Sequence, residues 1–306
     1  MLTASVALFT ILLINTRTNL TKKEIIARLA LAESNKQLEE KNEIIEEKNK
    51  DIRDSINYAQ RIQHAILPPL EKIDKVLADY FILFKPKDIV SGDFYWHAST
   101  HTTPKDGTPS ESIIVMAAVD CTGHGVPGAL MSIIGSTILN QSITSSDVNT
   151  PADALSFLNK QLAKNLNSIK DGMDMALCAI NLQKMELQFA GANNPLYILR
   201  NKQFIEVKPD KLAIGADHEN FESKMFTNHV IKLEKKDCIY LFTDGYADQF
   251  GGPKGKKFKY KKFQDLLIEI QDDKMEEQKH ILNDRHEQWK GKLEQVDDIL
   301  VIGIRV

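Results

Sequence analysis

Acidic side chains recur in this sequence at the edges of apolar stretches, where a buried strand would begin or end. They are Asp93 in a Ser-Gly-Asp bend, Asp120 after residues 113–119, Asp244 after residues 239–243, and Asp297-Asp298 before residues 299–306. One such Asp is usually a turn former. Four that gather in a fold repel one another and lose hydration unless a cation lies between them. A pair of divalent metal ions is the simplest such cation, so the pattern predicts a metal site.

The segment after Asp120 is rich in glycine, with Gly123, Gly125 and Gly128 within six positions. Glycine lets the backbone approach a ligand closely and adopt left-handed dihedral angles. A helix is expected from Leu130, because apolar residues then recur at helical spacing and should face a sheet. The members of this stripe are Leu130, Ile133, Ile134, Thr137 and Ile138.

Five motifs follow one another along residues 66–306. They are SGDFYW from Ser91, DCTGHGVPGA from Asp120, AGANNPLYILR from Ala190, LFTDGYADQFGG from Leu241 and QVDDILVIGI from Gln295. In this order they resemble the metal-dependent PP2C-type serine/threonine phosphatases, in the bacterial branch called SpoIIE-like or RsbU-like. The resemblance implies an α+β fold, in which two antiparallel sheets pack face to face as a β-sandwich with helices outside. The metals would lie at one end of the sandwich.

The resemblance also implies the metal ligands. Asp93 and Asp120 would hold one ion together with the backbone carbonyl of Cys121, Asp120 would bridge, and Asp244 and Asp297 would hold the second ion. Oxygen ligands favour two Mn²⁺ or Mg²⁺ ions over Zn²⁺. Such a pair activates water and stabilises the charge that develops in an in-line displacement at phosphorus. The implied reaction is hydrolysis of phosphoserine or phosphothreonine, with water as the nucleophile.

Three further residues are weaker candidates. Asp298 is the alternative to Asp297, and His124 would orient phosphate, act as a general acid or make a supporting hydrogen bond. Asp174 would supply a carboxylate for a third ion or form a turn. Many relatives carry an acid for that ion where this chain has Asn193 and Asn194, so a permanently bound third ion is not expected.

Other chemistries fit the residues less well. A Cys-x5-Arg phosphatase loop at Cys121 would need Arg where Pro127 stands, and a P-loop ending at Gly255-Lys256 would need Gly where Phe250 stands. Two alternatives remain: a catalytically weak domain that only binds a phosphoprotein, and a metal-dependent nuclease or phosphodiesterase. The lysine-rich residues 254–262 form either a docking surface for an acidic partner or a solvated loop. With a net charge of −3, no nucleic-acid partner is expected.

Composition allows one large domain and an appendage. The chain has 306 residues, of which 42% are hydrophobic and 26% charged, enough for a sizeable core. Its three cysteines lie in apolar runs, which is typical of reduced thiols in a cytoplasm. We expect residues 68–306 to form the phosphatase domain.

The N-terminal residues are of another kind. Residues 2–14 are mostly apolar, shorter than the about 20 residues that span a membrane. Because Arg17, Lys22 and Lys23 follow, we interpret residues 1–17 as a membrane anchor, the tail of a spanning helix. The catalytic domain would then be cytoplasmic, tethered to the inner face of the membrane. The alternative is a frayed helix start.

Residues 18–67 are predicted to form a coiled-coil linker. Apolar residues recur every seven positions, at Leu31, Leu38, Ile45, Ile52, Ala59 and Ile66. Asparagine lies four positions after each of the first three, at Asn35, Asn42 and Asn49. Asparagine at position a weakens a coiled coil but selects a parallel homodimer in register. Pro68-Pro69 should end the helix, and a lone solvated helix is the alternative. The family resemblance suggests that the substrate is a phosphorylated anti-sigma-factor antagonist or a similar regulatory protein.

Overall fold

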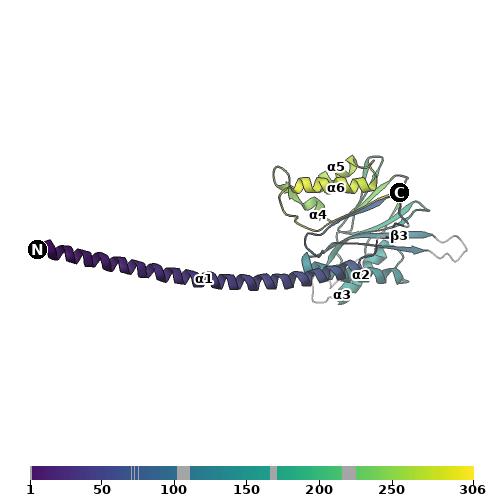
Figure 1. Cartoon of the computed structure of the whole chain (residues 1–306). Coiled ribbons are helices and arrows are strands. Elements are labelled where there is room, and N and C mark those ends of the chain that lie inside the picture. The colour runs from purple at the N-terminus through teal and green to yellow at the C-terminus, as the bar shows by residue number, and fades with distance from the viewer. Residues whose placement is uncertain are drawn as a thin grey trace. The chain divides into compact units, whose positions relative to one another are not determined.

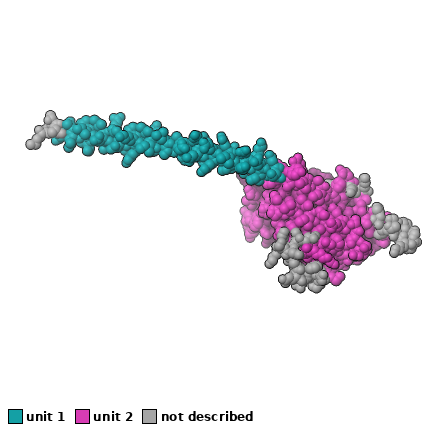
Figure 2. Space-filling model, turned by 90° about the horizontal axis from the view of Figure 1, so that it is seen from below, with its two compact units in different colours: residues 1–55 teal, residues 56–306 magenta. Residues whose placement is uncertain are grey.

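The computed structural model describes residues 2–69, 71, 73, 74, 76–101, 111–165, 171–215 and 225–306. The chain forms two compact units, residues 1–55 and residues 56–306 (Figure 2). The first unit is the greater part of helix α1 (Leu2–Ile66), and the last residues of that helix belong to the second unit.

Helix α1 runs without interruption because residues 21–66 contain no glycine or proline, and it ends just before Pro68-Pro69 as predicted. Its apolar ladder is open to solvent in the single chain, with Leu31 62% and Leu38 58% exposed. None of the helices among the described residues has a stretch long and apolar enough to cross a membrane. Both the coiled-coil dimer and the membrane anchor stay predictions.

The second unit is built on two antiparallel five-stranded sheets. In spatial order, the first sheet holds β1 (Tyr80–Lys85), β12 (Ile299–Arg305), β9 (Cys238–Phe242), β6 (Leu196–Arg200) and β7 (Gln203–Val207). The second holds β2 (Phe94–His101), β3 (Ser112–Cys121), β4 (Met173–Asn181), β5 (Glu186–Ala192) and β8 (His229–Lys232). A small hairpin joins β10 (Phe250–Gly251) to β11 (Lys256–Lys257). This architecture confirms the predicted α+β sandwich with a long helix before it.

Helices cover both outer faces of the sandwich (Figure 1). α2 (Gly125–Thr144) and α3 (Pro151–Asn165) pack on the second sheet, while α4 (Gly245–Asp248), α5 (Tyr260–Glu269) and α6 (Met275–Lys290) pack on the first.

The central strands β3, β6, β9 and β12 are mostly apolar because both of their faces are buried. In β9, Ile239 and Leu241 point between the sheets, whereas Tyr240 and Phe242 point towards α5 and α6. Side chains alternate across a strand, so one strand contributes to two cores.

Two details differ from the sequence-based expectations. Asp120 was expected just past the end of its strand, but β3 continues through Cys121, and Asp120 lies in the ladder opposite Asp174. Helix α2 begins at Gly125, and its expected apolar stripe is only partly right: Ile138 is buried, whereas Leu130 is 57% exposed. Besides Met131, Ile138 and Leu139, the helix packs through small residues, whose short side chains allow its backbone to approach its neighbours closely; they are Gly128, Ala129, Ser132, Gly135 and Ser136.

A histidine is buried in the layer formed by α6. His286 is 1% exposed, and its ring lies 5.4 Å from that of Tyr246. Burial, followed by the positive charge of Lys85, lowers the pKa of His286 to about 4, and Lys290 acts in the same direction against Glu287. The folded protein therefore keeps this imidazole neutral.

This burial predicts a pH-dependent stability. Between about pH 6.5 and pH 4 the unfolded chain binds a proton at His286 that the folded chain does not, so stability falls as the pH is lowered through this window. His286→Phe keeps the aromatic packing and removes the titration. Urea unfolding from pH 7.5 to 4 should show a shallower loss of stability for the variant than for the wild type. Equal slopes would contradict a buried neutral histidine.

Candidate active site

Strands from both sheets bring five carboxylates to one end of the sandwich. Asp93 precedes β2, and Asp120 and Asp174 pair in neighbouring strands β3 and β4 of the second sheet. Asp244 follows β9 and Asp297 lies two residues before β12, which are neighbours in the first sheet. The four predicted ligands therefore come from neighbouring strands on the two sheets, with Asp174 beside them.

These carboxylates lie near enough to perturb one another. Burial raises the pKa of Asp120 to about 8, and the negative charges of Asp244, Asp297 and Asp174 add to the effect. Burial also raises the pKa of Asp244 to about 6, with Asp297 the next cause. Asp93 is 3% exposed, and burial together with Asp120 raises its pKa well above the usual range. Such crowding of negative charge favours a bound cation.

Asp93 is oriented by a threonine that sequence reasoning missed. The Thr243 hydroxyl donates a hydrogen bond to Asp93 Oδ2 at 2.6 Å and accepts one from the Leu300 amide at 3.1 Å. Thr243 is 1% exposed and precedes Asp244, so one residue couples the Asp93 carboxylate to the first sheet. Its place beside Asp244 in the Thr-Asp-Gly motif was the available sequence clue.

The two acids before β12 have different environments. Asp298 is 2% exposed and accepts backbone hydrogen bonds from Lys87 at 2.7 Å and Gly92 at 2.8 Å. It therefore holds the loop that carries Asp93. Asp297 is exposed and raises the pKa of Asp120 and Asp244, so it faces the other carboxylates. Asp298 also raises the pKa of Asp93, but backbone amides already occupy both of its oxygens, so Asp297 stays the predicted ligand.

Two glycines permit backbone contacts that a side chain would block. A Cβ atom on Gly92 would lie 2.5 Å from the Gly123 carbonyl oxygen and 3.2 Å from that of Cys121. A Cβ atom on Gly245 would lie 1.9 Å from the Asp298 carbonyl oxygen. The Cys121 carbonyl is thus held in this tight backbone cluster beside Asp93. Burial keeps the pKa of the Cys121 thiol well above its usual range, which disfavours thiol chemistry.

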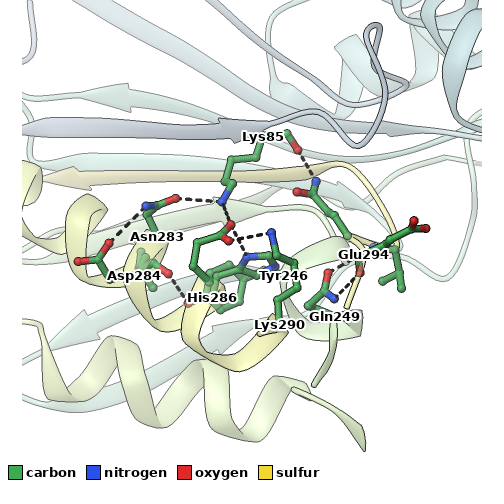
Figure 3. A network of polar contacts seen from close by, with 12 residues as sticks. Lys85, Tyr246, Gln249, Asn283, Asp284, His286, Lys290 and Glu294 are labelled. Atoms are coloured by element: carbon green, nitrogen blue, oxygen red, sulfur yellow. Dashed lines mark hydrogen bonds and ion pairs between the residues drawn. The ribbon is translucent and has the colours of Figure 1, made fainter. Parts of the chain in front are cut away.

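A polar network supports the segment before Asp297 (Figure 3). Gln249 is fully buried; its amide nitrogen donates to the Glu294 carbonyl at 3.0 Å, and its oxygen accepts from the Val296 amide at 3.3 Å. Gln295 donates to the carbonyls of Lys85 and Asp297, each at 2.8 Å. These bonds fix the loop against β1 and the end of α4.

The weaker candidates each have a defined partner. His124 is exposed and its Nδ1 lies 2.9 Å from Asp88 Oδ2. Asp174 Oδ1 accepts a hydrogen bond from the side-chain amide of Asn193 at 2.8 Å, and burial raises the pKa of Asp174. Asn193 thus occupies one Asp174 oxygen rather than adding a carboxylate.

A second residue that sequence reasoning missed lies on α1. Gln63 is 6% exposed; its amide nitrogen donates to the Ser91 carbonyl at 2.5 Å and to the Ser132 hydroxyl at 2.8 Å, and its oxygen accepts from the Ser91 amide at 3.2 Å. Ser91 is two residues before Asp93. A lone glutamine in a polar helix gives no sequence clue to this contact.

The donor set fits hard divalent cations, because it is made of carboxylates and one backbone carbonyl. Within the described residues, however, no three His, Cys, Asp or Glu side chains already form a metal-binding group. The carboxylates adjoin without converging on one point, as expected for negative groups that repel one another.

The hydrogen bond from Thr243 predicts a selective loss of function. Thr243→Val removes the hydroxyl, so Asp93 loses its orienting donor; we expect activity or Mn²⁺ affinity to fall about 10- to 100-fold. Steady-state kinetics and calorimetric Mn²⁺ titration check this. Thr243→Ser is the matched control and should keep most of both. Equal loss in the two variants would show that the methyl packing, and not the hydrogen bond, matters.

Two face-to-face antiparallel sheets, outer helices and acidic strand ends define a PP2C-type phosphatase domain. Among solved structures, the SiaA-PP2C domain of Pseudomonas aeruginosa is 32% identical and matches with a TM-score of 0.73 over 84% of this chain and 98% of that one.

Two more distant structures share the fold. The SpoIIE phosphatase domain with a regulatory fragment from Bacillus subtilis is 18% identical, with a TM-score of 0.57 over 74% of this chain and 63% of that one. The RsbU and RsbW domains of a Mycobacterium tuberculosis protein are 18% identical, with a TM-score of 0.56 over 74% and 59%.

The chain belongs to the SpoIIE family, because the profile of Stage II sporulation protein E (SpoIIE) matches residues 110–306. It is accordingly a protein serine/threonine phosphatase of the PP2C type, as the motifs predicted. A search among curated proteins finds no significant match.

Proposed function

We propose that this chain hydrolyses phosphoserine or phosphothreonine on a regulatory protein, using two Mn²⁺ or Mg²⁺ ions. Asp93, Asp120 and the Cys121 carbonyl would hold one ion, and Asp120, Asp244 and Asp297 the other. The observation that carries this proposal is the burial and mutual crowding of these carboxylates at one end of the sandwich. Burial raises the pKa of Asp120 to about 8, and the charges of Asp244, Asp297 and Asp174 add to the effect. When bound, the ions would supply an activated water and neutralise charge on the phosphoryl group.

The protein's own groups prepare this end of the sandwich. Thr243 orients Asp93, and Asp298 fixes the loop that leads to it. Gly245 lets α4 pack against the Asp297-Asp298 segment, so Asp244 and Asp297 stay close. His124, beside Asp88, is available to orient phosphate at the rim. Preorganised donors and acceptors of this kind lower the reorganisation needed during reaction.

The alternative, a domain that binds a phosphoprotein without turning it over, leaves the intact ligand set unexplained. Removal of one carboxylate would be enough to disable the site, yet all four predicted ligands are present and adjoin. A nuclease or phosphodiesterase is disfavoured by the family assignment.

The test is metal-dependent turnover of a phosphoserine protein. The wild type with Mn²⁺ should release phosphate, and chelation by EDTA should abolish release until Mn²⁺ is restored. Asp120→Asn and Asp244→Asn should each lower the rate by roughly a hundredfold or more, because each removes a ligand. Asp147→Asn, an exposed turn residue, is the matched control. An Asp120→Asn protein with a near wild-type rate would overturn the assigned site.

We further propose that a dimeric helical linker gates this activity. The support is Gln63, which joins α1 to Ser91 in the Asp93 loop and to Ser132 in α2. A rotation of α1 about its axis would withdraw this side chain and release the loop. Two packings of the helix pair would then correspond to two activity states. A membrane tether at residues 1–17 would give the linker a fixed point from which to act.

Asn42→Leu with Asn49→Leu tests the gate. Apolar side chains at these a positions should tighten the dimer and hold the enzyme in one activity state. Sedimentation velocity and phosphatase assays on the same samples measure both effects. Adding Gln63→Ala should remove the link between them, so that the rate no longer follows the linker. A monomer at tens of micromolar whose rate ignores the asparagine changes would make the linker a passive spacer.

A further inference from the structure

Six lysines crowd the segment that follows α4. We call Lys254, Lys256, Lys257, Lys259, Lys261 and Lys262 the basic hairpin surface; all six are exposed. The whole chain has a net charge of −3, so this is a local excess. Within the described residues, ion pairs engage two of them, Lys257 with Asp248 at 2.7 Å and Lys261 with Asp265 at 2.8 Å. The other four make no ion pair in that part of the chain.

The basic hairpin surface is fastened beside the carboxylates. Short α4 follows Asp244 directly, and the Lys259 amide donates to the Ala247 carbonyl in α4 at 2.7 Å. Lys257 pairs with Asp248, the last residue of α4, and its positive charge lowers the pKa of Asp244 against the larger effect of burial. The Lys257 ammonium therefore lies near the Asp244 carboxylate, and the other lysines of the surface belong to the same short segment.

Several of these lysines stand where local stability disfavours them. Lys259 is the N-cap of α5, with φ of 75° and ψ of 148°, a region that favours glycine. Lys261 and Lys262 lie in the first turn, which has no acidic residue, although the helix dipole disfavours cations there. Their charges add to the positive helix end and create a strong attraction for anions. A feature that breaks local rules is expected at functional positions.

A groove of about 360 Å³ adjoins these lysines, between the hairpin and helices α5 and α6. Phe258, Leu266 and Trp289 supply apolar lining. The charged lining is balanced, because Lys262 and Arg285 face Asp265 and Glu269, and Arg285 pairs with Glu269 at 3.0 Å. Trp289 is fixed, since its indole donates to the Gln249 carbonyl at 3.0 Å and the Lys262 ammonium lies 3.6 Å from its ring centroid. The groove therefore fits an apolar side chain, and the positive charge that would attract an acidic protein segment lies on the adjoining basic hairpin surface.

We propose that the basic hairpin surface docks an acidic segment of the phosphoprotein substrate, with an apolar side chain of that segment in the adjoining groove. The inference rests on the proposed phosphatase function and adds the chemical class of its partner. A substrate phosphate must enter among carboxylates, where it gains little long-range attraction. Lysines beside the site attract the rest of the substrate, so they lower KM and raise the association rate.

Two synthetic phosphoserine peptides of equal length test the proposal. One carries Asp and Glu on both sides of the phosphoserine and one Leu, and the other has Asn and Gln in place of the acids. With Mn²⁺ at fixed concentration, the wild type should hydrolyse the acidic peptide with at least tenfold higher kcat/KM. The preference should reside in KM and shrink as NaCl rises from 50 to 500 mM, because salt screens charges.

The triple variant K254E/K256E/K259E should lose this preference. It leaves Lys257, the neighbour of Asp244, in place. The control K160E/K235E/K274E makes the same change of net charge at exposed positions in α3, in the turn before β9 and at the start of α6, and should keep the preference. The variant K254Q/K256Q/K259Q removes the three charges without reversing them, so it should lose part of the preference. It replaces the glutamate variant if charge reversal impairs folding.

Lys259→Gly separates docking from structure. Glycine relieves the unusual dihedral angles and removes a cation from the start of α5, so the melting temperature should rise while the preference for the acidic peptide falls. A purely structural role for Lys259 predicts no loss of preference in a more stable protein.

The outcomes are distinct. Failure of the wild type to hydrolyse either peptide or p-nitrophenyl phosphate with Mn²⁺ would overturn the proposed function itself. Hydrolysis of both peptides with equal kcat/KM, or an unchanged preference in K254E/K256E/K259E, would overturn the docking proposal alone. Lysine-dependent binding to phosphatidylserine vesicles without any peptide preference would assign the surface to lipid and equally overturn it.

Discussion

Repulsion between carboxylates is the constraint on which this fold depends. Asp120 and Asp174 stand opposite each other in paired strands, and Asp244 and Asp297 approach from the other sheet. In the absence of a cation, each of these groups raises the pKa of another. The sandwich must hold them near one another by its own packing, and a cation bound among them would relieve their repulsion. Without a cation, electrostatic repulsion within such a site opposes folding.

Three kinds of contact supply the rigidity that this arrangement needs. Asp298 accepts hydrogen bonds from backbone amides in the loop before β2, so it links the start of β12 to the second sheet at the site. Thr243 links β9 to Asp93. Backbone segments meet at Gly92 and Gly245 so closely that a methyl group would collide with a carbonyl oxygen. These residues are not themselves predicted metal ligands, but each fixes the position of a carboxylate that is.

The sequence predicted the strands and the four acids at their edges from local patterns, whereas the family resemblance implied the face-to-face sandwich. Apolar runs mark strands, and an acid at the end of a run marks the edge of a sheet. It could not predict that β3 runs through Asp120, since the boundary depends on the ladder with Asp174. The buried face of α2 was partly wrong for a related reason. The hydrophobic pattern placed Leu130 on the buried face, whereas close packing buries Gly128 and other small residues together with Ile138.

Contacts between residues distant in sequence were beyond pattern analysis. Gln63 and Ser91 are separated by 28 positions, and the glutamine stands in a helix full of polar side chains. Thr243 lies within a motif that the sequence showed, but its hydrogen bond to Asp93 could not be predicted. The choice of Asp297 over Asp298 rested on resemblance and stays a prediction, because the sequence could not show the backbone hydrogen bonds that Asp298 accepts.

The position of Gln63 also restricts how this protein can evolve by recombination. Residues 56–66 of α1 belong to the same compact unit as the sandwich, so the catalytic module begins inside a helix rather than at a loop. Each residue inserted upstream turns the preceding part of the helix by about 100° relative to Gln63. Insertions or deletions in α1 upstream of Gln63 therefore nearly preserve the helical phase only when they comprise whole heptads, each of which leaves a turn of about 20°.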